Sequence, residues 1–72
     1  MINERIDKLK DIIDETETDI KNIQFVVKDL KKIELNRIED KCMLNACIEK
    51  LESEISFLED IKENDEAILN TL

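Results

Sequence analysis

The sequence predicts an all-α fold: an antiparallel helical hairpin of two long amphipathic helices, which self-associates into a four-helix bundle. Three observations predict it. The 72 residues include no Gly and no Pro, the residues on which tight turns usually depend. A hydrophobic repeat of seven residues runs from one end of the chain to the other, and it fails in one place near the middle.

The repeat defines a seam along each helix. With Ile6 at heptad position a, 15 of the 21 a and d positions are aliphatic. Three consecutive failures at Glu34, Arg37 and Lys41 mark the point where we expect the chain to fold back. The seam residues expected to form the core and the oligomer contacts are Ile6, Leu9, Ile13, Ile20, Ile23, Val27, Leu30, Leu44, Ile48, Leu51, Ile55 and Leu58.

We expect one helical domain over residues 1–72. Its elements are a helix at about 2–34, a turn at about 35–36, a helix at about 37–62, and a C-terminal tail or helix extension at 63–72.

Local signals support a turn near 34–36. Asn36 followed by Glu39 has the spacing of a capping box, with Asn in the Ser/Thr role. Asn also tolerates the left-handed conformation that ends many helices. Lys31 and Lys32 lie near the expected end of the first helix, where cations favour the helix dipole, and Glu39 and Asp40 lie in the first turn of the second, where acids do.

Two other architectures fit the repeat. One is a single continuous coiled-coil helix, ~108 Å long, that dimerises. In a parallel dimer, however, none of the g-to-e pairs would join opposite charges, and Arg5 would face Lys10 while Glu54 would face Glu59. The other is a three-helix chain with a second break near Thr16, where a Thr occupies a d position.

The apolar stripe is wider than a coiled-coil seam. Position g is apolar in most heptads, which indicates a helix packed into a multi-helix core. A lone hairpin cannot cover such a face, so we expect a homo-oligomer, with a dimer favoured. The apolar g residues are Ile12, Val26, Ile33, Cys47, Ile61 and Ile68.

The net charge of −8 is unevenly distributed. Residues 1–20 carry −4, residues 21–41 carry +2 and residues 42–72 carry −6. A hairpin places the net basic segment 21–33 beside the net acidic segment 42–54. Bases are too few and too interleaved with acids for nucleic-acid binding. No uncharged run approaches the ~20 residues that span a membrane, so we expect a soluble, intracellular and cytoplasmic protein.

No catalytic, cofactor or metal site is expected, nor a small-molecule substrate. His is absent, so Cys42 and Cys47 supply only half of a tetrahedral zinc site. Five residues apart on a helix, these two thiols cannot bridge to each other. We expect Cys47 to be a small buried residue and Cys42 a partly exposed thiol. Zinc or a disulfide shared between protomers is the alternative.

The sequence therefore predicts a non-enzymatic protein–protein interaction and self-assembly module. The alternative is a small acidic regulator or inhibitor, including a nucleic-acid mimic of phage or viral type, that binds a basic protein surface. A third hypothesis, a nucleic-acid chaperone acting through 28–41, must overcome the acids in that stretch. The candidate partner face is Phe25, Phe57, Glu52, Glu59, Glu63 and Glu66.

Overall fold

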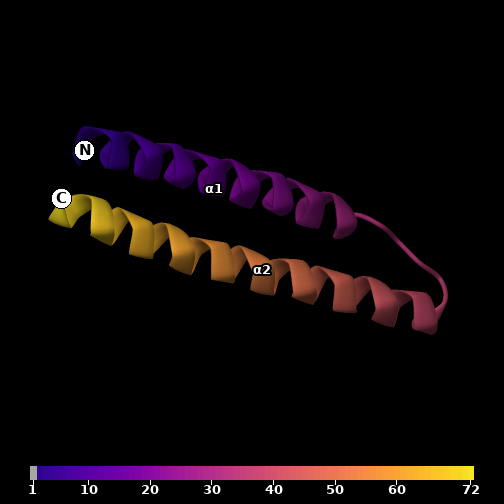
Figure 1. The fold of residues 1–72 in the computed structure, drawn as a ribbon. Helices are drawn as coiled ribbons and strands as arrows, with labels where there is room; N and C mark the ends of the chain where they lie inside the picture. The colour runs from indigo at the N-terminus through magenta and orange to yellow at the C-terminus, as the bar shows by residue number, and fades with distance from the viewer. Residues whose placement is uncertain (1) are drawn as a thin grey trace.

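The computed structural model describes residues 2–72, and these form a helical hairpin. Helix α1 (Ile2–Leu30) and helix α2 (Ile38–Thr71) are joined by a connector at 31–37. The helices lie side by side, and the two ends of the chain lie at the same end of the molecule (Figure 1). The Cα atoms span 57 × 15 × 13 Å. The predicted hairpin is thus confirmed, and the chain is not a continuous rod.

Helix α1 buries one side chain per heptad at position a. Ile13, Ile20 and Val27 are each less than one-tenth exposed, because every seventh residue returns to the side that faces α2. Thr16 is also buried, and its Oγ1 donates a hydrogen bond to the carbonyl of Ile12 at 2.9 Å. The hydroxyl is therefore satisfied within its own helix. Because α1 is unbroken here, the three-helix alternative is wrong.

The first helix ends at Leu30, four residues before the predicted position 34. Its last carbonyls accept hydrogen bonds from the connector, first at a spacing of four residues and then at three, which satisfies the helix end. No residue within 2–72 has a positive φ, so the left-handed Asn ending is not used. The bonds are Lys31 N to Val27 O (3.0 Å), Lys32 N to Asp29 O (3.1 Å) and Ile33 N to Leu30 O (3.1 Å).

Helix α2 begins one residue later than predicted, and a different residue caps it. Arg37, not Asn36, occupies the N-cap, with extended backbone (φ −88°, ψ 133°) and no capping hydrogen bond from its side chain. Its guanidinium Nη2 instead lies 3.2 Å from Oε2 of Glu39. Glu39 and Asp40 do lie in the first turn, as predicted. The helix dipole, rather than a capping box, stabilises this end.

The second helix continues through the polar interruption in its C-terminal part. It reaches Thr71, so the segment at 63–72 extends the helix and does not form a separate tail. Lys62 and Asp65 occupy seam positions there and are half-buried. Seam contacts resume at Leu69, which is also half-buried. Two polar residues in the seam are therefore tolerated without a break in the helix.

Candidate self-association surface

The two helices pack along the predicted seam without forming a dry core. No side chain in the described part of the chain is less than 2% exposed. A hairpin has a single helix–helix interface, so each seam side chain is covered from one side only. Ile13, Ile20, Val27 and Ile48 are buried, and the half-buried seam residues are Ile6, Leu9, Ile23, Leu30, Leu44, Leu51, Ile55 and Leu58.

Ion pairs between the helices lie along one side of the seam. Lys31 Nζ lies 3.0 Å from Glu52 Oε1, and Lys62 Nζ lies 3.0 Å from Glu17 Oε1. Lys62 also lies 3.8 Å from Glu66 Oε1. Except for Lys62 these are heptad e positions, so the e positions of both helices share one side. We call this side the polar edge; its residues are Glu17, Gln24, Lys31, Glu52, Glu59, Lys62 and Glu66.

The Glu17–Lys62 pair shifts the titration of both groups. The hydrogen bond from Lys62 and its charge lower the pKa of the Glu17 carboxyl below the ordinary 4.5. The same hydrogen bond raises the pKa of Lys62 above 10.5. Both side chains remain about one-third exposed, at 31% and 40%, so water screens the pair and its contribution to stability is small. The polar edge is satisfied within the hairpin but is not its main source of stability.

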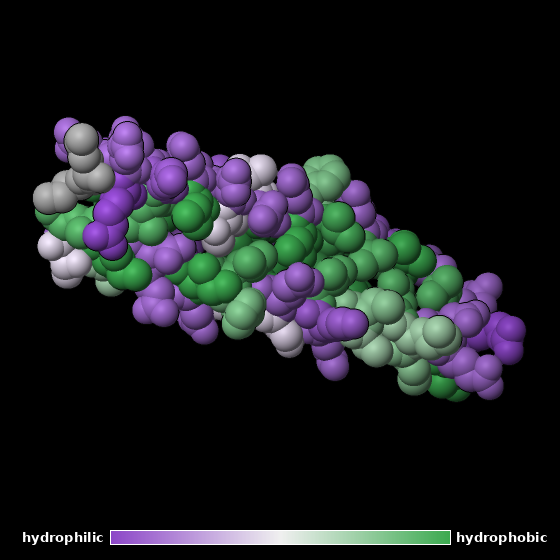
Figure 2. All heavy atoms as spheres, in the orientation of Figure 1, coloured by the Kyte–Doolittle hydropathy of each residue, from purple (hydrophilic) through white to green (hydrophobic). Residues whose placement is uncertain are grey.

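The opposite side of the seam is hydrophobic and has no partner within the hairpin. On a helix, position g lies on the far side of the a/d seam from position e. Three of its side chains are about half exposed, and Figure 2 shows a band of hydrophobic side chains running along the hairpin between hydrophilic outer faces. We call this the apolar edge; its residues are Ile12 (48% exposed), Val26 (47%), Ile68 (51%), the exposed Cys47 and the half-buried Ile61, while Ile33 (46%) lies beyond α1 in the connector.

The expectation that Cys47 is buried is wrong for the hairpin. Both Cys42 and Cys47 are free and exposed. Cys47 lies at position g, and α1 covers only the a and d positions of α2. Burial of Cys47 therefore requires something beyond the hairpin, as it does for the rest of the apolar edge.

The residues of the candidate partner face occupy more than one side of the hairpin. Phe25 on α1 and Phe57 on α2 are 67% and 64% exposed, and they occupy different heptad positions, f and c. Glu52 and Glu66 are held by lysines on the polar edge. Glu59 and Glu63 line an open groove beside Lys62. The acidic residues thus lie together on the polar-edge side, whereas the two phenyl rings lie outside that edge.

Two features were missed in the sequence, the ion pairs across the polar edge and the exposure of Ile38. The ion pairs depend on the register between the helices, because a turn centred near residue 35 would place Lys31 opposite residue 39, whereas Lys31 pairs with Glu52. Ile38 and Met43, at the start of α2, are 77% and 70% exposed. The repeat could have identified both, because Ile38 at position e and Met43 at position c lie outside the a, d and g stripe.

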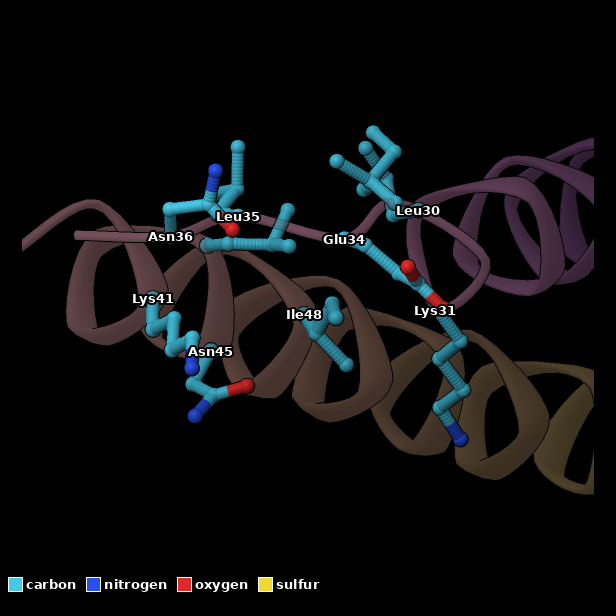
Figure 3. A pocket seen from close by; sticks show the side chains of 10 residues that line it. Leu30, Lys31, Glu34, Leu35, Asn36, Lys41, Asn45 and Ile48 are labelled. Carbon is cyan, nitrogen blue, oxygen red and sulfur yellow. The ribbon is translucent and has the colours of Figure 1, made fainter. Parts of the chain in front are cut away.

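A second groove lies beside the connector. It is open and has a volume of about 520 Å³. Figure 3 shows Ile48 on α2 between Lys41 and Asn45 on one side and Lys31 on the other, with Leu30 across from it at the end of α1. These polar side chains are spread along the groove and do not converge on one point, so they do not define a catalytic or ligand-binding centre.

Other classes of site receive no support from the described residues. Within residues 2–72 no three His, Cys, Asp or Glu side chains come together as metal ligands. Neither α1 nor α2 has the length and apolar character needed to cross a membrane. No protein-family model, curated protein or solved structure matches the chain. The function must therefore be inferred from the surface of the hairpin itself.

Proposed function

We propose that this chain is a non-enzymatic self-assembly module, in which two hairpins pair through their apolar edges to form an antiparallel four-helix bundle. The observation that carries this proposal is the row of half-exposed Ile and Val side chains along the apolar edge. The lack of a dry core in the hairpin points in the same direction. Each copy completes the core of the other.

The dimensions of the hairpin suit a dimer. A face of 57 × 15 Å offers an area on the order of 800 Å², which is what each partner buries in a standard interface. Covering the exposed half of each Ile or Val on the apolar edge stabilises the dimer by roughly 1 kcal/mol per side chain. Two-fold symmetry doubles that contribution. Association itself costs about 4–15 kcal/mol. Further burial of the half-exposed seam side chains in the dimer must therefore also contribute to its stability.

The remaining surface favours closure at two copies. The polar edge pairs its charges internally, and the net charge of each copy is −8. Highly charged outer faces repel further copies. A pair of hairpins joined through a single apolar edge therefore buries the hydrophobic band and leaves charged faces outside.

Concentration-dependent unfolding tests the proposal. If the folded state is a dimer, a roughly 100-fold increase in protein concentration raises the melting temperature measured by circular dichroism. A melting temperature that stays constant over this range would mean a hairpin that folds alone, and it would exclude self-assembly as the source of stability.

A second candidate function is an acidic regulator that binds a basic protein surface. The exposure of Phe25 and Phe57 outside both edges favours it, because exposed aromatic side chains often anchor protein contacts. Salt separates the two functions. An apolar dimer persists in ~1 M NaCl, whereas a complex held by acidic side chains weakens steeply as salt rises.

A further inference from the structure

Two arrangements can bring two apolar edges together. A half-turn about an axis parallel to the helices places both connectors at the same end of the bundle. A half-turn about an axis across the helices places them at opposite ends. Both bury the same side chains, and neighbouring helices are antiparallel in each. The hydrophobic band alone therefore does not choose between them.

The distribution of charge along the hairpin favours one of the two arrangements. The ion pairs Glu17–Lys62 and Lys31–Glu52 show which residues of α1 and α2 lie at the same level. By this register, the half near the chain ends contains residues 2–20 and 61–72, with four bases, ten acids and a charge of −6. The half near the connector contains residues 21–60, with seven bases, nine acids and a charge of −2.

Three acids on the g side of the seam bear on the same choice. Asp19, Asp40 and Glu54 occupy g positions; Asp19 and Glu54 are exposed in the hairpin, and Asp40 is half-buried. Same-end docking places each acid at the same level as its copy in the partner. Opposite-end docking moves the copies of Asp40 and Glu54 apart along the bundle axis, because both residues lie in the connector half, whereas Asp19 lies close to the midpoint and stays near its copy. It also carries Lys32, Arg37 and Lys41 of one copy to the acidic half of the other.

We infer that the second copy docks with its connector at the opposite end of the bundle, so that the more acidic half of each hairpin lies against the less acidic half of its partner. This inference rests on the proposed self-association. Like charges in a partly enclosed interface repel more strongly than in free solution, so the preference acts even though both halves are acidic. Screening by salt weakens it.

Distance measurement between spin labels tests the orientation. The native thiols are removed with Cys42→Ser and Cys47→Ala, and a label is placed at Asn36→Cys in the connector. Opposite-end docking predicts a label separation comparable with the 57 Å length of the hairpin. Same-end docking predicts about 20 Å, because neighbouring helices pack about 8–10 Å apart.

A label at Lys21→Cys, near the midpoint, serves as the positive control. It gives a short separation in either arrangement, so it reports on dimerisation alone. Monomer mass with no coupling at either position would overturn the proposed function and the inference together. Short separations at both positions would overturn the inference and leave self-association intact.

A pair of matched charge variants tests the cause. Lys32→Glu with Lys41→Glu brings the connector half from −2 to −6, equal to the other half. We expect a short Asn36→Cys separation to appear in part of the population. Lys8→Glu with Lys10→Glu gives the same net charge but increases the asymmetry, and it should keep the long separation. An unchanged long separation in both variants would overturn the electrostatic origin of the orientation.

Discussion

The two edges of this hairpin have the same length and the same seam between them, yet they differ in how they are satisfied. Along the polar edge, Lys31 pairs with Glu52 and Lys62 pairs with Glu17, so the charges find partners within one chain. Along the apolar edge, Ile12, Val26 and Ile68 remain about half exposed. One side of the hairpin therefore pairs its charges within the chain, whereas the other leaves its apolar side chains uncovered.

This difference indicates how a small helical chain limits its own assembly. An interface on both sides of the seam favours open-ended stacking, whereas an interface on one side allows a closed pair. The polar edge contributes little stability, because its ion pairs are exposed. Its larger effect is to keep that side hydrated and to direct association to the apolar edge.

A charge buried in the seam should unfold the hairpin and so abolish both edges, and this is the largest effect we expect. Ile48 is 9% exposed, and Ile48→Asp places a carboxylate between the helices at a cost of several kcal/mol. Such a cost exceeds the margin of a small domain, so helicity at 222 nm and dimer mass should be lost together. The matched control is Lys50→Asp at an exposed position of α2, which should keep both. A folded monomer from Ile48→Asp would contradict a core that depends on dimerisation.

Adding charges to the apolar edge or to the polar edge tests which of the two edges mediates dimerisation. Val26→Glu with Ile68→Glu puts two carboxylates per copy into the apolar edge, and we expect the dissociation constant to rise at least ~100-fold, or about 2.7 kcal/mol. Gln24→Glu with Asn45→Glu adds the same charge at exposed e positions and should change it less than ~5-fold. Sedimentation equilibrium measures both, and equal weakening would contradict the distinction between the edges.

The buried hydroxyl of the seam gives a smaller effect of opposite sign. Thr16→Val keeps the branched shape and removes a polar atom that bonds only to the carbonyl of Ile12, so we expect a gain of about 1 kcal/mol in the free energy of unfolding. Thr18 makes the same bond, to the carbonyl of Asp14 at 3.0 Å, but is exposed. Thr18→Val should change stability by less than ~0.5 kcal/mol in urea titrations. Equal gains would mean that burial is not the cause.

The smallest effect lies on the polar edge. The lowered pKa of Glu17 means that its stabilisation is present above pH 4.5 and is lost as the pH falls through the folded-state pKa. The raised pKa of Lys62 means that its stabilisation is present below pH 10.5 and is lost as the pH rises above it.

Comparing the wild type with Lys62→Met isolates this pair. As the pH falls below 4.5, the stability difference should shift toward the variant, because Glu17 no longer gains from Lys62. NMR titration of the Glu17 carboxyl should show a higher pKa in the variant. A pKa that is the same in both proteins would show that the pair does not form in solution.

The sequence predicted the helices better than their ends. The seven-residue repeat specifies which side of each helix is covered, because burial of a whole stripe outweighs local preferences. End signals are worth only about 1 kcal/mol each, so the connection between the helices can override them. Asn36 had the better capping chemistry, yet Arg37 takes the N-cap because the chain crosses from α1 to α2 in an extended conformation.

The sequence likewise predicted the residues of the candidate site but not the contacts between them. The wide stripe identified the residues of the apolar edge, including Ile12, Val26 and Ile68, which the structure leaves about half exposed. The sequence could not show that Lys62, at a seam position, reaches Glu17 on the other helix. That contact depends on the register between α1 and α2, which the connector at 31–37 sets.

Small-angle scattering with in-line mass determination over a concentration series tests the central claim most directly. The account predicts a particle of twice the 8.5 kDa chain mass, close to the 57 Å hairpin in length, which dissociates and loses helicity on dilution. A fully helical particle of 8.5 kDa at every concentration would contradict it, because the apolar edge would then need no second copy.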